Sequence, residues 1–335
     1  MLLTICYVTA RKDNQVAWFL DSLHRELGGR YEDVEVIVVD FWAEAQRPGE
    51  GWSAAQASDH RASYRARKRG GELRVVPPAP NVWQGPHRLT RENWYAKSNA
   101  LNTAVMHARG RHLLFFDDLS VLRPGFMSFA RRAMCAPRRI TAFAHDKYDQ
   151  MVVADGRIVS ARPRQPRPFD DRVRASQGKP IRAPSGGWTY GQGLLVPLEA
   201  ALSLNGWPQD CDGMRSQDSA FGIVAANAGF EIFFDPRAVV VESADRHDDG
   251  SVVMRGGSNA LHRGKKRKET FLARCRTMRR FDNYYGSRGL AGVRQDVLAG
   301  RPVPRLLQPT ADWFSGTPLG RYDPPRPNNE LARRF

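Results

Sequence analysis

The sequence predicts an α/β protein with a Rossmann-like, mostly parallel sheet and flanking helices. The first observation behind this is a succession of segments with the spacing of a βαβ unit, which places two parallel strands around a right-handed crossover. An apolar strand, an amphipathic helix and a second apolar strand occupy 2–8, 16–27 and 34–39. Glycines at 28 and 29 end the helix, and Asp40 ends the second strand.

The second observation concerns the stretch from 97 to 126. Ala100, Leu101, Ala104 and Val105 recur at helical spacing, and a short apolar run at 113–116 follows. That run is too short to span a membrane and has the length of a buried strand. It ends in Asp117 and Asp118. Carboxylates at the carboxyl end of such a strand lie where open α/β sheets bind ligands.

The remaining pattern continues the alternation of helices and strands. We expect helices at 126–134, 198–204 and 217–226, and strands at 73–76, 141–145, 151–153, 157–159, 230–234 and 239–241. Asp235-Pro236 should separate the last two strands. The segment 162–182 is rich in Pro and Arg, and we expect a mobile loop over a ligand or partner surface.

Length and composition support a folded protein with anionic partners. The 335 residues include 41% hydrophobic residues, and the net charge is +16, which favours nucleic acid, acidic lipid or polyanionic glycan. The four cysteines are far apart and form no CxxC pair, as expected of reduced thiols. The N-terminus is predicted to be a strand, not a signal peptide, and no transmembrane run is found, so we expect a cytoplasmic protein.

Basic segments are candidates for nucleic-acid binding. Four consecutive cations, Lys265, Lys266, Arg267 and Lys268, add to basic stretches at 61–69 and 157–182. Such side chains bind phosphates without regard to sequence. The chain has no helix-turn-helix, zinc-finger or RNA-recognition motif, so any recognition would use shape and backbone. Trp, Tyr and Arg in 83–95 and 185–190 could hold an extruded base.

The order of these parts resembles the GT-A glycosyltransferases, and the broad glycosyltransferase family 2 in particular. The first half carries Thr9-x-Arg11, Asp40, Lys97-x-x-Ala-Leu-Asn102 and Asp117-Asp118. The second half carries Asn205-Gly206-Trp207, Asp212-Gly213 and the segment 217–222, which resemble the acceptor segment of galactosyltransferase-like members. The resemblance covers about 2–250. It implies a GT-A domain at 1–250, divided into a nucleotide-sugar half (1–126) and an acceptor half (127–250), before a basic, helical and Pro-rich extension at 251–335.

The resemblance also implies residue roles. Asp218 would be the catalytic base. The donor would contact Thr9, Arg11, Asp40, Lys97, Asn102 and Asp117. A divalent cation, Mn²⁺ or Mg²⁺, would bind Asp118 and His247, with His262 as a second candidate. Leu119 stands where a third Asp often supplies a metal oxygen. The acceptor would be lined by Gly187, Trp188, Trp207 and Gln217, part of them in a glycine-rich loop at 185–193.

Each of these residues also has a simpler structural interpretation. Asp40, Asp117, Asp118 and Asp218 could be caps of turns or helix ends, Lys97 a surface lysine, His247 a solvated loop residue and the glycine-rich loop a plain turn.

Three functional hypotheses follow. The leading one is a metal-dependent, inverting glycosyltransferase that uses a nucleotide-sugar donor, expected to be a UDP-sugar, and a hydroxyl acceptor such as a hydroxymethylated base in DNA. The second keeps this chemistry with a surface glycan or a lipid-linked acceptor. The third is a nucleic-acid-binding protein on a GT-A scaffold that has lost catalysis.

Overall fold

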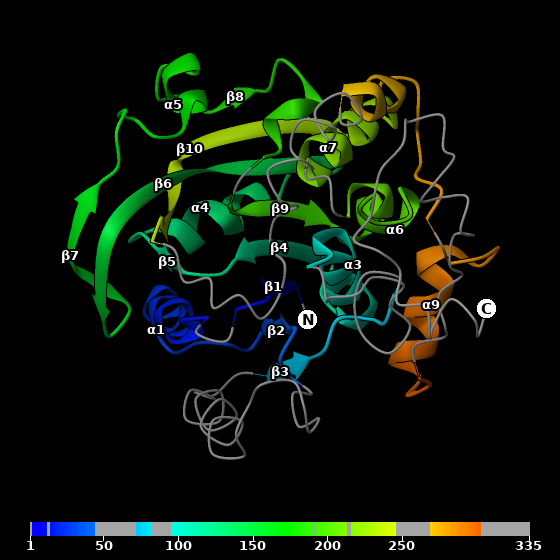
Figure 1. Ribbon diagram of the computed structural model, residues 1–335, viewed down its shortest axis with the longest axis horizontal. Helices are drawn as coiled ribbons and strands as arrows, with labels where there is room; N and C mark the ends of the chain where they lie inside the picture. The colour runs from blue at the N-terminus through cyan, green and yellow to red at the C-terminus, as the bar shows by residue number, and fades with distance from the viewer. Residues whose placement is uncertain are drawn as a thin grey trace, which may run out of the picture.

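The structure is a computed structural model, and it describes residues 2–11, 14–43, 72–81, 95–190, 192–212, 216–245, 269–283 and 285–302. In this part of the chain the strands form one mixed sheet in the order β3-β2-β1-β4-β9-β6-β10-β5, with β7 paired to β6 and β8 to β10. Helices flank the sheet (Figure 1). The predicted α/β class is confirmed.

The first half of the chain forms the predicted parallel part of the sheet. Its elements are β1 (Leu3–Thr9), α1 (Val16–Leu27), β2 (Val34–Asp40), β3 (Glu72–Val76), α3 (Lys97–His107) and β4 (His112–Asp117). The strand β1 pairs in parallel with both β2 and β4, and β2 pairs in parallel with β3. The carboxyl ends of these strands therefore share one edge of the sheet.

The second half extends this sheet. Its elements are β5 (Ser120–Leu122), α4 (Phe126–Ala133), β6 (Arg139–Ala154), β7 (Arg157–Pro163), α5 (Asp171–Ala175), β8 (Ile181–Arg182), the 3₁₀ turn η1 (Gly186–Trp188), β9 (Leu194–Pro197), α6 (Leu198–Ser203), the 3₁₀ turn η2 (Gln209–Cys211), α7 (Gln217–Asn227), β10 (Glu231–Ser243) and α9 (Gly289–Leu298). The antiparallel strand β9 joins β4 to β6.

Two predictions about this half are wrong. The expected break at Asp235-Pro236 is a bulge inside the single strand β10, where the register to β6 shifts between Asp235 and Val239. The segment 162–182 is not a loop throughout, because it contains the end of β7, the helix α5 and the strand β8. Arg172 in α5 is only 2% exposed and anchors this segment in the interior.

Two apolar layers cover the two faces of the sheet. On one face, Phe19 of α1 and Phe126 of α4 pack with Phe116. On the other face, residues of α3, α6 and α7 pack together with Phe271 and Leu290 from the described C-terminal segments. Part of the predicted extension thus shares a core with the first 250 residues. No helix in the described residues is long and apolar enough to cross a membrane.

A glycine pair sets the distance between η1 and α7. A Cβ on Gly222 would lie 2.1 Å from the Gly186 carbonyl oxygen and 2.1 Å from Thr189 Oγ1. A Cβ on Gly186 would lie 2.3 Å from the Gly222 carbonyl oxygen. These two glycines therefore allow backbone to pack on backbone. This contact holds part of the glycine-rich loop against the helix that carries Asp218.

We predict that Gly222→Ala destabilises the fold by roughly 1–3 kcal/mol, because the added methyl group overpacks this contact. Helix propensity alone would favour alanine by about 1 kcal/mol, so a loss of stability can only come from the contact. Urea unfolding measures the change. Gly187→Ala is the matched control, since its Cβ would meet only Ser185 Oγ at 3.5 Å. Equal stability of the two variants would contradict the prediction.

Candidate active site

Charged side chains from both halves of the sheet meet at the carboxyl end of β4. Asp117 is the last residue of β4, and Lys97 is the first residue of α3. Asp218 lies in the first turn of α7. The fold thus brings together three residues that the sequence analysis placed in one site.

Lys97 joins the two halves of this site. Its Nζ donates to Asp117 Oδ2 at 2.6 Å and lies 3.8 Å from Asp218 Oδ2. Burial opposes the charge of the ammonium group, but Asp117 and Asp218 outweigh this effect and raise the pKa of Lys97. The side chain is therefore a cation held between two carboxylates and is not a surface lysine.

Asp118 lies beside the end of β1. Its Oδ2 accepts a hydrogen bond from Thr9 Oγ1 at 3.1 Å and lies 3.0 Å from Arg11 Nε. Burial raises the pKa of Asp118 to about 6, although Arg11 opposes this change. The predicted donor residues Thr9 and Arg11 therefore contact the residue predicted to bind the metal.

Asp218 is held from three sides. Gln217 Nε2 donates to its Oδ2 at 3.2 Å, and Thr189 Oγ1 donates to its backbone carbonyl at 2.6 Å. Burial raises the pKa of Asp218 to about 6, against the opposing effects of Lys97 and of the nearby Trp207 side chain. A carboxylate with a pKa near neutrality in a buried site is suited to proton transfer.

Two residues that the sequence predicts to contact a ligand are fully buried in the described chain. Asn102 is fully buried, and its amide bonds both the N–H of Trp207 (2.7 Å) and its carbonyl (2.9 Å). Trp207 is also fully buried, and its ring stacks on Phe221 with centroids 4.1 Å apart. Asn102 therefore ties α3 to the segment before α7, and Trp207 packs against Phe221 of the helix that carries Asp218.

The other predicted residues lie around this centre. Asp40 is fully buried at the end of β2, and its Oδ1 accepts the N–H of Trp42 at 2.8 Å. Gly187 and Trp188 are half-buried in η1, and the Trp188 ring packs edge-on against Phe234. The cations at 265–268, as well as His247 and His262, lie outside the described residues.

Leu119 adopts a left-handed backbone conformation with φ 57°. Its side chain is 1% exposed and lies in the interior, and its N–H donates to the Tyr7 hydroxyl at 3.2 Å. A non-glycine residue in this conformation stores strain of about 1–3 kcal/mol, and such strain clusters at functional sites. The third position of Asp-Asp-Leu therefore serves packing and does not point an oxygen toward a ligand.

Sequence reasoning did not assign roles to two residues of this site. Gln192 is 3% exposed, and its Oε1 accepts the N–H of Asp117 at 2.7 Å, while its buried Nε2 has no partner among the described residues. Glu242 of β10 raises the pKa of Asp118 and accepts a hydrogen bond from Lys147 at 3.1 Å. One sequence feature could have identified Gln192: it lies between two glycines, just before an apolar strand.

The described residues supply some of the oxygen ligands that a hard divalent cation requires, but not a complete coordination shell. Asp118 Oδ1 has no partner among the described residues, and carboxylate oxygens are the ligands such cations prefer. The described residues contain no group of three His, Cys, Asp or Glu that could hold a metal. A cation here would rely on Asp118, on donor phosphates and on water, which is an arrangement that Mg²⁺ commonly adopts.

A buried carboxyl group supports the start of α3. Asp212 is 3% exposed, and its Oδ1 accepts the N–H of Ser98 at 2.7 Å. Burial raises the pKa of Asp212 to about 8, although the N–H groups of Ser98 and Asn99 oppose this change. Folding therefore favours the protonated form, and stability contributed by this group is lost as the pH rises toward 8.

We predict that Asp212→Asn is more stable than the wild type at alkaline pH, because asparagine keeps an oxygen for Ser98 and carries no charge. Between pH 6 and pH 8 the wild type should lose roughly 2–3 kcal/mol relative to the variant, at about 1.4 kcal/mol per pH unit. Urea unfolding at both pH values measures this. The surface variant Asp33→Asn is the control, and parallel pH dependence of Asp212→Asn and wild type would contradict the assignment.

Comparisons with known proteins bear on the fold. No protein-family model and no curated protein sequence matches the chain. Among solved structures, GalNAc-T7 with UDP, GalNAc and Mn²⁺ is 11% identical with a TM-score of 0.51, and the match covers 91% of this chain and 59% of that chain. Two further matches have TM-scores of 0.48.

One of these two is S. aureus TarS 1–349 in complex with UDP, at 14% identity over 73% of this chain and 61% of that chain. The other is the mannosyltransferase PcManGT from Pyrobaculum calidifontis with GDP-Man and Mn²⁺, at 16% identity over 81% and 62%. The chain spans about three fifths of the length of each of these three solved chains. The match to GalNAc-T7, together with the sheet order, shows that this chain has the GT-A fold that its sequence predicts.

Proposed function

We propose that the chain is an inverting glycosyltransferase that moves a sugar from a nucleotide-sugar donor to a hydroxyl acceptor. The observation that carries this proposal is the contact of Lys97 with both Asp117 and Asp218. It places a candidate donor residue and a candidate base within reach of one cation. A donor bound beside Asp117 and an acceptor bound beside Asp218 would therefore meet between these two carboxylates.

The donor side of the proposed site is formed by the ends of β1, β2 and β4. Thr9, Arg11 and Asp40 lie there, and Asp117 and Asp118 complete it. GalNAc-T7, whose fold this chain shares, was solved with UDP and Mn²⁺, which supports a UDP-sugar and a divalent cation as the first choices here. Held by Asp118, such a cation would neutralise the negative charge that develops on the departing diphosphate.

Asp218 is the proposed general base. In its ionised form it takes the proton of the acceptor hydroxyl while that oxygen bonds to the anomeric carbon. The bond between this carbon and the diphosphate oxygen breaks on the opposite face, and the electron pair leaves with the nucleotide diphosphate. Lys97 favours the ionised form of Asp218, because it lowers a pKa that burial has raised.

For the acceptor we propose nucleic acid, with a hydroxymethylated base in DNA as the first choice. The net charge of +16 supports a polyanionic partner. Most of this excess comes from segments outside the described residues, such as 61–69 and 263–268. A surface glycan or lipid-linked sugar is the alternative acceptor, and a catalytically inactive nucleic-acid-binding protein is the alternative function.

We predict that Asp218→Asn lowers the rate of sugar transfer by about 10²–10⁴-fold, because the variant keeps the shape of the side chain and loses the base. Donor affinity, measured by calorimetry with the UDP-sugar, should change little. In the wild type, kcat/KM should fall below about pH 6, where Asp218 becomes protonated. Ser219→Ala on the same helix is the control. A variant as active as the wild type would exclude Asp218 as the base.

We also predict that the wild type adds the mass of one sugar to hydroxymethylated bases in duplex DNA when Mn²⁺ and a panel of sugar nucleotides are present. Mass spectrometry of the digested DNA measures this addition. Asp118→Ala should abolish the Mn²⁺-dependent part, since it removes the carboxylate that we propose as the metal ligand. Donor hydrolysis without any gain of mass in the DNA would favour the glycan or lipid acceptor. Absence of both would favour the inactive scaffold.

A further inference from the structure

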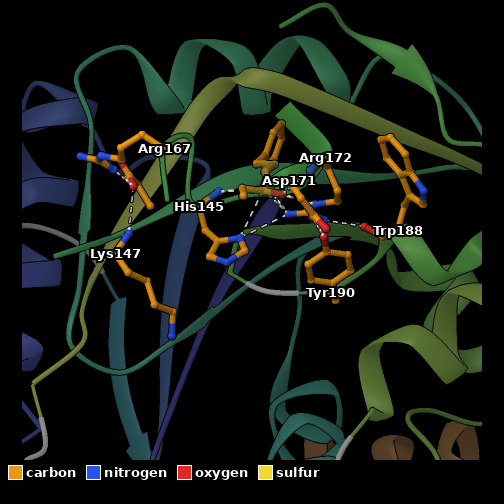
Figure 2. Close-up of polar contacts among 10 residues, drawn as sticks. His145, Lys147, Arg167, Asp171, Arg172, Trp188 and Tyr190 are labelled. Carbon is orange, nitrogen blue, oxygen red and sulfur yellow. Dashed lines mark hydrogen bonds and ion pairs between the residues drawn. The ribbon is translucent and has the colours of Figure 1, made fainter. Parts of the chain in front are cut away.

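A buried cluster fills the free edge of β6 beyond the end of β9 (Figure 2). Arg172 Nη2 donates to the Phe143 carbonyl at 3.0 Å, and Asp170 Oδ2 accepts the His145 N–H at 3.2 Å. These two side chains therefore satisfy backbone groups that a neighbouring strand would otherwise pair. Both side chains are 2% exposed or less.

The contacts of Arg172 determine which nitrogen of His145 carries its proton. Arg172 Nη2 has two hydrogens, and its two short contacts are Asp170 Oδ2 at 2.7 Å and the Phe143 carbonyl at 3.0 Å. No hydrogen is left for His145 Nδ1, which lies 3.4 Å away.

His145 Nδ1 also lies 3.3 Å from Asp170 Oδ2. Arg172 donates from Nε to Asp170 Oδ1 at 2.9 Å and from Nη2 to Oδ2 at 2.7 Å, so Asp170 is an ionised carboxylate and only accepts. Nδ1 must therefore carry a hydrogen and donate it to Asp170. In the neutral ring this leaves a lone pair on Nε2.

The Nε2 atom is available for a ligand. It has no hydrogen-bond partner among the described residues, and the side chain remains 8% exposed. Figure 2 shows the side chains of His145 and Lys147 projecting to the same side of the cluster, while the Tyr190 hydroxyl points back to Asp171. Lys147 Nζ donates a hydrogen bond to Glu242, and Glu242 raises the pKa of Asp118. This side of the cluster therefore faces the candidate active site.

One short segment connects this cluster to the reacting residues. The Trp188 carbonyl accepts from Arg172, and Thr189 donates to the Asp218 carbonyl. Tyr190 packs edge-on to His145, with ring centroids 6.3 Å apart. Gln192 binds the N–H of Asp117. His145 thus lies on the Asp218 side of β4, away from the donor-side strands β1 and β2.

We propose that His145 is an acceptor-binding residue whose Nε2 lone pair takes a hydrogen bond from a hydroxyl or N–H group of the acceptor, beside the hydroxyl that reacts. Asp170 and Arg172 are positioning residues that fix the ring. This proposal rests on the proposed glycosyltransferase activity and names the residue that contacts its acceptor.

Two substitutions separate binding from structure. His145→Asn retains an amide nitrogen at the position of Nδ1, so it can still donate to Asp170, but it has no atom at the position of Nε2. His145→Gln places an amide group near Nε2. We expect His145→Asn to unfold at the same urea concentration as the wild type and to raise the KM for hydroxymethylated duplex DNA about tenfold, with donor hydrolysis in the absence of DNA unchanged.

His145→Gln should recover part of the acceptor affinity. Equal KM values for His145→Asn and the wild type would overturn the proposal, because the hydrogen bond from the acceptor would then be absent. A parallel loss of donor hydrolysis in His145→Asn would also overturn it, because the residue would then act on the donor or on the fold.

A second measurement needs no acceptor. In the full chain labelled with ¹⁵N-histidine, at pH 8, the His145 signals are identified by their loss in His145→Asn. We expect a protonated Nδ1 and an unprotonated Nε2. A protonated Nε2 would overturn the proposal whatever the acceptor. Failure of the proposed function would show differently, as absence of donor hydrolysis in the wild type.

Discussion

The candidate site depends on one ammonium group placed between two carboxylates. Lys97 begins α3, Asp117 ends β4 and Asp218 lies in the first turn of α7, so the contact exists only when both halves of the sheet are assembled. Each carboxylate is partly withdrawn from water, where an unpaired charge would be costly. The ammonium group of Lys97 offsets this cost for both carboxylates and fixes the distance between them. The rest of the structure positions these three elements: β9 joins the halves, Asn102 ties α3 to the segment before α7, and the Gly186–Gly222 contact sets the depth of α7.

The same balance of charge extends across the site. Arg11 lies beside Asp118, Lys97 beside Asp117, and Lys147 beside Glu242. Because each of these three acids lies beside a cation, the acids can lie close together in the absence of a ligand. A diphosphate entering this site would compete for Arg11 and Lys97, and a divalent cation would compete with them for Asp117 and Asp118. The donor and the metal would then bind together as a neutralised pair. They would replace the existing contacts of Arg11 and Lys97 with the two aspartates.

Much of the fold could be predicted because local pattern and tertiary structure agree. The helix at Val16–Leu27 has one apolar face, and the strands before Asp40 and Asp117 are continuous apolar runs. The prediction failed where a distant contact decides the local structure. Asp235-Pro236 looks like the end of a strand, but β6 pairs on both sides of it. The Arg- and Pro-rich segment 162–182 looks like a loop because its one buried cation, Arg172, is paired with Asp170 and with backbone atoms that are remote in sequence. Trp207 and Asn102 match the motif, but only the structure shows that Asn102 binds the Trp207 backbone and that the Trp207 ring stacks on Phe221 of α7.

The two kinds of charge in this chain suit two different tasks. In the described body, many acids lie beside a base, Thr189 binds the Asp218 carbonyl, and Asp170 binds the His145 N–H. Such fixed groups can distinguish one acceptor hydroxyl from another, because an unmatched hydrogen bond in a buried site is costly. The excess of positive charge comes mostly from residues outside the described ranges, and Lys and Arg attract a polyanion over a longer range with little regard to its detail. Capture of a polyanionic acceptor and selection of the reacting hydroxyl would then be carried by separate parts of the chain. A substitution that alters one of these two tasks would therefore not require a substitution in the part that performs the other.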